Sequence, residues 1–354
     1  FYSSIDADSE GGEGKYYTWG SYEIDLILYK DAEIFNDYFG ISQQGNWGDV
    51  NILNKSADIS DLARKYNQPE SKIREVIQKG KALLLEKRKK RTPPAKDHKT
   101  IVSWNALAIT AFIHGYRASG KRDYLRIALN SAENIISHQL ESDYRLMRIY
   151  ADGKSSVDGF LDDYAFLGEA LLELYQITFD DKWVDWAAKI TDYAFKNFSD
   201  SRAYLLNYAR KSDQRLTTNK KEVIDAVLPA SNSVFARNLY ILGQYFASEI
   251  YIDRARKMLA EANTMIPKDP SFFSNWIGLM LWFVHPPYEV AIIGRKAEEY
   301  RSRFEHLYHP GIILAGGTHE GNLPILKNRF KLGKTQIYIC QGQVCQEPVN
   351  NVED

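Results

Sequence analysis

Four carboxylates lie close together near the start of the chain, in the run from Ser4 to Trp19. They are Asp6, Asp8, Glu10 and Glu13, and glycines and aromatic residues stand among and after them. Carboxylates held close together raise one another's pKa values, which acid/base chemistry and polyol binding can both exploit. Glycine lets the backbone turn sharply and approach a ligand. The run therefore predicts a reactive, ligand-binding loop, and the alternative is a solvated acidic turn or an incomplete cation site.

Polar residues also recur where the most apolar helical segments begin. These starts are Ser103-Trp104-Asn105, Asp162-Asp163-Tyr164, Ser231-Asn232-Ser233 and Ser274-Asn275-Trp276. In a ring of helical hairpins the inner helices run parallel, so their starts gather at one end with their positive dipole ends. Ser, Asp and Asn are also favoured N-caps, which need no ligand. Asp163 and Asn105 lie just inside the expected caps, where a side chain can reach a cavity.

The elements that must position these residues follow from hydrophobic patterning. Residues 103–119, 163–178 and 233–246 are apolar on nearly all sides, whereas residues 123–140, 182–198 and 253–265 are apolar on one side only. A helix that is apolar all round must be covered on all sides, and a one-sided helix lies at the surface. Hairpins of one buried and one exposed helix therefore repeat every 60 to 70 residues or so, which predicts a solenoid or a closed (α/α) toroid.

The flanking segments complete the expected organisation. Upstream, residues 31–39, 60–66 and 70–90 are predicted helices. Downstream, residues 288–293, 311–315 and 336–340 are short runs rich in Ile, Val and Tyr that predict strands, and residues 297–308 predict a helix. We therefore expect an all-α toroid segment over residues 1–285 and a small α/β tail over residues 286–354.

Composition narrows the function classes. Lys plus Arg number 45 and Asp plus Glu 46, so the net charge of −1 gives no reason to expect nucleic acid or an anionic membrane as a partner. The basic run 87–91 is interpreted as a solvated helix end, with nucleic-acid contact as a weaker alternative. No apolar stretch reaches the length of about 18 residues that a spanning helix needs, and we expect a cytoplasmic protein.

Residues with metal, redox or nucleotide chemistry are sparse. Cys340 and Cys345 match neither a redox C-x-x-C nor a complete zinc site, and they are expected as reduced thiols in a small sheet. His114 lies in an apolar helix and is expected as a core histidine. No H-E-x-x-H, Walker loop, G-x-G-x-x-G or G-x-S-x-G is present, so no metal and no cofactor are expected.

The run from Ser4 to Trp19 resembles the signature of the YyaL-like proteins, also called the spermatogenesis-associated protein 20 family. Further matching residues are Gly45-Asn46-Trp47, Asn51-Ile52-Leu53, Arg91, Pro94, Asp97, Lys99, Ser103-Trp104-Asn105, Asp162-Asp163-Tyr164-Ala165-Phe166, Cys340, Cys345 and Pro348. The resemblance implies an N-terminal thioredoxin-like domain followed by an (α/α) barrel similar to the six-hairpin glycosidases and to N-acylglucosamine 2-epimerase. It further implies that this chain is the C-terminal half of such a protein, without the thioredoxin-like part and the first hairpins.

Together these observations predict a barrel that binds or acts on a carbohydrate, with epimerase-, isomerase- or glycosidase-like acid/base chemistry. Asp6, Asp8 and Asp163 are the candidate catalytic acid and base. The candidate substrate-binding residues are Glu10, Trp19, Asp97, Trp104, Asn105, Asp162, Tyr164 and Asn232, with the aromatic rings of Trp104 and Tyr164 stacking on the sugar. The alternative is a non-catalytic scaffold that works with the thioredoxin-like half.

Overall fold

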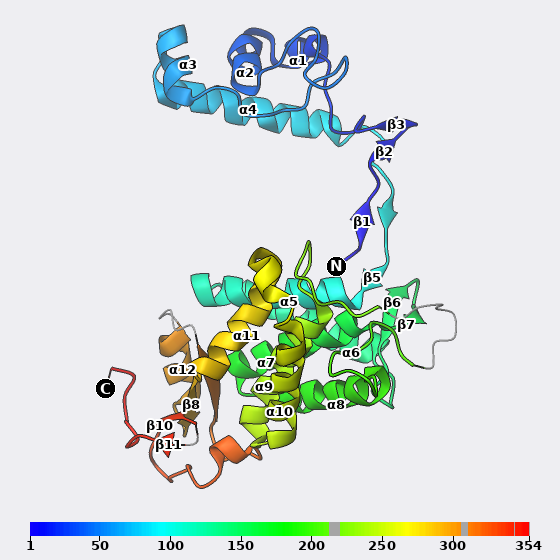
Figure 1. Ribbon diagram of the computed structural model, residues 1–354. Helices are drawn as coiled ribbons and strands as arrows, with labels where there is room; N and C mark the ends of the chain where they lie inside the picture. Colours follow the sequence, from blue (N-terminus) through cyan, green and yellow to red (C-terminus); the bar gives the residue numbers. More distant parts are fainter. Residues whose placement is uncertain (212–219, 306–310, 343, 354) are drawn as a thin grey trace. The chain divides into compact units, whose positions relative to one another are not determined.

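The computed structural model describes residues 1–211, 220–305, 311–342 and 344–353. The chain divides into two compact units (Figure 1). The small unit is Tyr2–His98, and the large unit is Lys99–Asp354 together with Phe1.

The small unit is a cluster of helices with short strands at its ends. Its helices are α1 (Ser21–Leu28), α2 (Ala32–Phe39), α3 (Ile59–Tyr66) and α4 (Glu70–Arg88), and its strands are β1 (Ser4–Ile5), β2 (Asp8–Ser9), β3 (Gly12–Glu13) and β4 (Lys96–Asp97). The helices enclose an apolar core that includes Trp19, Phe35 and Ile77. At Gly80 the backbone of α4 lies so close to the Phe35 ring that a Cβ atom would stand 2.5 Å from it. The helices predicted over 31–39, 60–66 and 70–90 are confirmed.

The large unit is built from helical hairpins. The hairpins are α5 (Val102–Ser119) with α6 (Arg122–Gln139), α7 (Leu161–Thr178) with α8 (Asp181–Phe198), and α9 (Ser231–Phe246) with α10 (Glu249–Ala262). Contacts run from α5 to α7 and from α7 to α9, and α11 (Ser274–Val284) follows against α9 and α10 (Figure 1). The predicted helix-hairpin fold class is confirmed, with α5, α7, α9 and α11 as the inner series.

Burial along the inner series follows the prediction for α7 and α9 but not for α5. Nearly every residue of α7 and α9 is buried. At one point the two helices touch closely, because Asn238 Nδ2 donates to Ala165 O at 2.7 Å beside Gly168. The expectation that α5 is covered on all sides is wrong, since Trp104 is 47% exposed and Ala111 is also exposed. The reason is that α5 packs mainly against α6 and α7, whereas α7 has α5, α8 and α9 around it.

Two sheets complete the large unit. β5 (Thr100–Ile101), β6 (Met147–Ala151) and β7 (Lys154–Asp158) form an antiparallel sheet, and β8 (Tyr288–Ile293), β9 (Ile312–Gly317), β10 (Gln336–Gln341) and β11 (Val344–Cys345) form a second one in the order β11-β10-β8-β9. Only the β8–β9 pair of the second sheet is parallel. The helix predicted over 297–308 is α12 (Ala297–Glu305), and the rest of that prediction lies outside the described residues.

The second sheet shares a core with the helices. Tyr245 Oη donates to Leu314 O at 2.9 Å, and Leu314 N donates to Gln176 Oε1 at 3.1 Å. Apolar side chains of β8 and β9 join the same buried cluster as α7 and α9. The predicted boundary at residue 285 therefore marks a change of secondary structure inside the large unit.

Cys340 and Cys345 lie opposite each other in the β10–β11 pair and are joined by a disulfide. The expectation of two reduced thiols is corrected, because the tight antiparallel connection brings the two side chains together.

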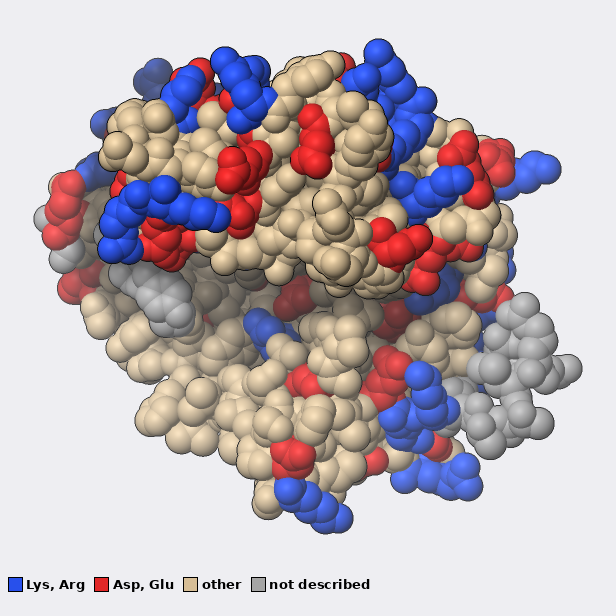
Figure 2. All heavy atoms as spheres, turned by 90° about the horizontal axis from the view of Figure 1, so that it is seen from above, with Lys and Arg blue, Asp and Glu red and all other residues tan. Residues whose placement is uncertain are grey.

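Acidic and basic side chains are intermixed over the face shown in Figure 2, in keeping with the near-zero net charge. Within the described part of the chain, no helix has the length and apolarity to cross a membrane.

Candidate functional site

The acidic run near the start of the chain folds as a tight hairpin in the small unit. β2 pairs with β3, so that Asp8 lies opposite Glu13. Glu10 and Gly11 form the turn with φ angles of 50° and 76°, the positive values that a two-residue hairpin turn requires. Asp6, Asp8 and Glu10 are exposed, and Glu10 contacts Lys15 Nζ at 3.4 Å and Thr92 Oγ1 at 3.1 Å. The hairpin therefore presents its carboxylates to solvent.

Arg91 organises the segment that follows this hairpin. Its guanidinium donates to the carbonyl oxygens of Lys15, Tyr16 and Thr18 at 3.2, 3.1 and 2.7 Å. It also donates to both Glu23 oxygens, at 2.9 and 2.8 Å, and lies 3.9 Å from the centroid of the Trp19 ring. The Trp19 side chain is thus buried beneath an arginine. Lys87, Lys89 and Lys90 are exposed at the end of α4, as expected for a solvated helix end, whereas Arg91 holds the loop in place.

The predicted site residues fall into both units. Asp6, Asp8, Glu10, Trp19 and Asp97 belong to the small unit, where Asp97 lies in β4 opposite Ser4. The other six, Trp104, Asn105, Asp162, Asp163, Tyr164 and Asn232, belong to the large unit. A site shared between the two groups stays a prediction.

In the large unit, Asp163 joins the starts of two inner helices. Its Oδ1 accepts the Ser103 N–H at 2.9 Å, and its Oδ2 accepts the Phe160 N–H at 2.9 Å and Arg148 Nη1 at 2.7 Å. Arg148 also donates to Asp162 Oδ1 at 2.9 Å. Burial and the adjacent Asp162 carboxylate raise the pKa of Asp163 to about 7, against the opposing effect of Arg148. The predicted gathering of polar groups at the helix starts is therefore present for α5 and α7, as a network of internal hydrogen bonds.

The remaining predicted residues of the large unit are mostly engaged within the protein. Tyr164 is 1% exposed, its hydroxyl accepts the Leu146 N–H at 2.8 Å and its ring stacks on Tyr193. Asn232 is fully buried and donates to two backbone carbonyls, those of Leu206 and Glu222. Asn105 is 4% exposed and donates to Ile101 O at 2.9 Å. Trp104 alone of these six is an exposed side chain.

A second polar cluster joins α5, α7 and α9 away from the helix starts, and the sequence prediction missed it. Glu169 and Glu173 lie one turn apart on α7, and each side chain is 17% exposed. Arg117 of α5 forms a close ion pair with Glu173, and Arg237 of α9 lies 3.4 Å from Glu169. We call Arg117, Glu169, Glu173 and Arg237 the inner row. Its signal in the sequence was the pair of glutamates that interrupts an otherwise apolar helix.

The pKa values of the two glutamates of the inner row are shifted in opposite directions. Burial raises the pKa of Glu169, and the neighbouring Glu173 carboxylate adds to the rise against the effect of Arg237. Burial acts on Glu173 too, but Arg117, His114 and Arg237 together lower the pKa of Glu173. His114 was expected in the core and is instead exposed on α5, where it favours the charged form of Glu173. Carboxyls with separated pKa values can take the roles of proton donor and ionised partner.

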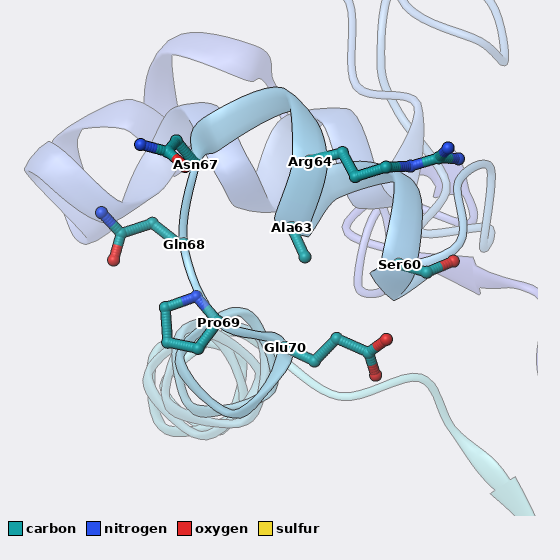
Figure 3. A pocket seen from close by; sticks show the side chains of 7 residues that line it. All are labelled: Ser60, Ala63, Arg64, Asn67, Gln68, Pro69 and Glu70. Carbon is teal, nitrogen blue, oxygen red and sulfur yellow. The ribbon is translucent and has the colours of Figure 1, made fainter.

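A concavity also lies at the corner between α3 and α4 of the small unit (Figure 3). It has a volume of 680 Å³ and is lined by Ser60, Ala63, Arg64, Asn67, Gln68, Pro69 and Glu70. Its charged side chains already form ion pairs, Arg64 with Asp61 and Glu70 with Arg74. Since the lining side chains are mostly exposed, this surface offers less to a ligand than the inner row. The described residues contain no group of side chains suited to hold a metal ion.

No family model matches the chain. The chain is 26% identical over 394 residues to the uncharacterized protein B0495.5 of Caenorhabditis elegans, covering 100% of this chain and 54% of that protein. It is 25% identical over 399 residues to human spermatogenesis-associated protein 20, covering 99% of this chain and 51% of that protein. The predicted resemblance is confirmed as homology along the whole chain. The chain spans about half the length of these relatives.

Solved structures similar to this chain include carbohydrate-active enzymes. The GH76 α-mannanase BT2949 of Bacteroides thetaiotaomicron has a TM-score of 0.43 at 16% identity, covering 61% of this chain and 59% of that one. The cellobiose 2-epimerase of Bacillus thermoamylovorans has a TM-score of 0.39 at 14% identity, covering 46% of this chain and 44% of that one.

Proposed function

We propose that the large unit binds a carbohydrate at the inner row and acts on it by acid/base chemistry. The observation that carries the proposal is the pair Glu169 and Glu173, which lie one turn apart with pKa values moved in opposite directions. Two carboxyls whose pKa values are moved apart, one toward the protonated and one toward the ionised form, can supply the acid and the base for cleavage of a glycosidic bond held between them or for transfer of a proton at a sugar carbon.

The surroundings give each glutamate its own role. Glu169, whose proton is retained to higher pH, is the proton donor. Glu173 is held ionised by Arg117, and a fixed carboxylate at that point stabilises positive charge that develops on the sugar ring. We assign the donor role to Glu169 in preference to Asp163, because both Asp163 oxygens already accept hydrogen bonds inside the protein.

The test is ligand-observed NMR in D2O with a panel of mono- and disaccharides. We expect saturation transfer to at least one sugar, together with bond cleavage or loss of a sugar C–H signal. Glu169→Gln keeps the shape but removes the titrating group, so turnover falls by about a hundredfold or more while binding persists. The matched control is Glu133→Gln, which changes an exposed glutamate of α6 that pairs with Lys182 at 3.1 Å. Turnover that is equal in all three proteins contradicts the role of Glu169.

A partner-binding scaffold is the second candidate. The observation that favours it is that Trp104 and Ala111, two turns apart on α5, are both exposed. Large exposed aromatics beside small apolar residues suit contact with another protein surface. Silence across the sugar panel, with co-purification of a thioredoxin-like domain that is lost in Trp104→Ala, supports this alternative over the enzyme.

A further inference from the structure

Arg237 holds its partners less closely than Arg117 does. Its Nη1 atom lies 3.4 Å from Glu169 Oε1 and 3.4 Å from Asn275 Oδ1 of α11. Both distances are at the far limit of a hydrogen bond, and both involve the same nitrogen. Arg117, in contrast, forms a close ion pair with Glu173 and also reaches Glu305 at 3.7 Å. Arg117 is therefore engaged by close partners, whereas Arg237 can still form short hydrogen bonds with a ligand.

The Arg237 guanidinium is also held in place. It lies 5.2 Å from the centroid of the Trp282 ring of α11, which is within range for a cation–π contact. The side chain is 27% exposed, so solvent reaches it. The other N–H groups of this guanidinium have no partner among the described residues. A guanidinium that lies against an aromatic ring and keeps such donors is suited to bind a carboxylate or phosphate through two parallel hydrogen bonds.

We infer that Arg237 binds an anionic group of the substrate, so that the sugar recognised at the inner row carries a carboxylate or a phosphate. This inference rests on the proposed function and gives it a substrate class. The anion replaces two long contacts by short charge-assisted ones. Since Arg237 adjoins Glu169, a sugar anchored in this way places its ring or its glycosidic oxygen beside the proton donor. Trp282 offers apolar surface beside the same anchor.

The experiment compares three sugars by isothermal titration, namely glucose, glucuronate and glucose 6-phosphate, and includes inorganic phosphate as the anion without a sugar. We expect the protein to bind at least one acidic probe about tenfold or more tightly than glucose, and this preference to shrink as salt is added. Arg237→Gln removes the charge and abolishes the preference. The matched control is Arg256→Gln, since Arg256 of α10 also lies 5.2 Å from an α11 ring, that of Phe283. It pairs with Asp253 at 4.0 Å and lies outside the inner row.

The outcomes separate this inference from the function on which it rests. Equal affinity for glucose and both acidic probes overturns the anionic substrate class and leaves a neutral-sugar enzyme. If inorganic phosphate binds as tightly as glucose 6-phosphate, Arg237 belongs to an anion site without sugar recognition. This result overturns both the inferred substrate class and the proposed carbohydrate site. An equal loss in Arg256→Gln overturns the role of Arg237. A preference confined to glucuronate or to glucose 6-phosphate supports the inference and identifies the group. Circular dichroism and thermal unfolding establish that each variant is folded.

Discussion

Asp163 Oδ1 on α7 accepts the backbone N–H of Ser103 on α5 at 2.9 Å. The other oxygen of the same carboxylate accepts the N–H of Phe160, which precedes α7. One buried side chain therefore satisfies donors at the starts of two inner helices, and such donors have no partner within their own helix. Arg148 supplies the compensating charge. This relationship gives the polar helix starts a structural role in joining α5 to α7.

The first prediction concerns the stability of this junction. In Asp163→Asn only one side-chain oxygen remains, and the amide nitrogen faces donors in place of an acceptor. We expect the free energy of unfolding to fall by about 2–4 kcal/mol, because buried N–H donors lose their acceptor. Urea unfolding followed by circular dichroism measures the change.

Its control is Asp123→Asn. Asp123 also lies at the start of a helix of the large unit and pairs with Arg126 at 2.9 Å, but both side chains are exposed. Exposed pairs of this kind contribute at most about 0.5 kcal/mol. Equal small effects in both variants would show that Asp163 does not hold the junction together.

The second prediction is a pH dependence of stability. The pKa of Asp163 is about 7 in the folded protein and near its ordinary value of 3.8 when unfolded. Between these values the folded state binds more protons, so this group's contribution to the unfolding free energy falls as pH rises. The contribution is complete below about pH 4 and is lost as pH rises through about 7. The difference between the unfolding free energies of wild type and Asp163→Asn, measured across this range, isolates the group. A difference that does not change with pH refutes the raised pKa.

The helices could be predicted because their signals are local. Residues 163–178 show their helical period and their burial in the sequence itself, and α7 spans Leu161–Thr178. Trp104 shows where this reasoning stops, because an apolar helix does not reveal which of its faces has a neighbour. Tyr164 and Trp19 show the same limit of sequence-based prediction. The sequence does not distinguish an aromatic residue that lines a pocket from one that fills a core.

The inner row could not be predicted, for a different reason. Glu169 and Glu173 were visible as interruptions of an apolar helix, but their properties depend on Arg117 and Arg237. Arg117 and Glu173 lie 56 positions apart in the chain, and only the packing of α5 against α7 brings them together. The pKa values that separate the two glutamates are likewise a product of tertiary burial.

The third prediction concerns Arg91 in the small unit. Arg91→Lys keeps the charge but loses the planar fork that reaches three carbonyl oxygens and both Glu23 oxygens. We expect the unfolding free energy of this unit to fall by about 1–3 kcal/mol, with faster amide exchange around Trp19. Hydrogen exchange followed by mass spectrometry reports the change. Arg64→Lys, in an exposed pair with Asp61, is the control and leaves exchange around Trp19 unchanged.

The fourth prediction concerns the two cysteines. Because Cys340 and Cys345 are joined, the purified protein takes up no iodoacetamide under denaturing conditions without a reductant, and two labels after reduction. The disulfide closes a very short loop between β10 and β11, and short loops restrict the unfolded chain little. Reduction therefore lowers the unfolding free energy by no more than about 2 kcal/mol. Intact-mass analysis counts the labels, and urea unfolding with and without reductant measures the energy. Two labels on the unreduced protein would show that Cys340 and Cys345 are free thiols and that the prediction is wrong.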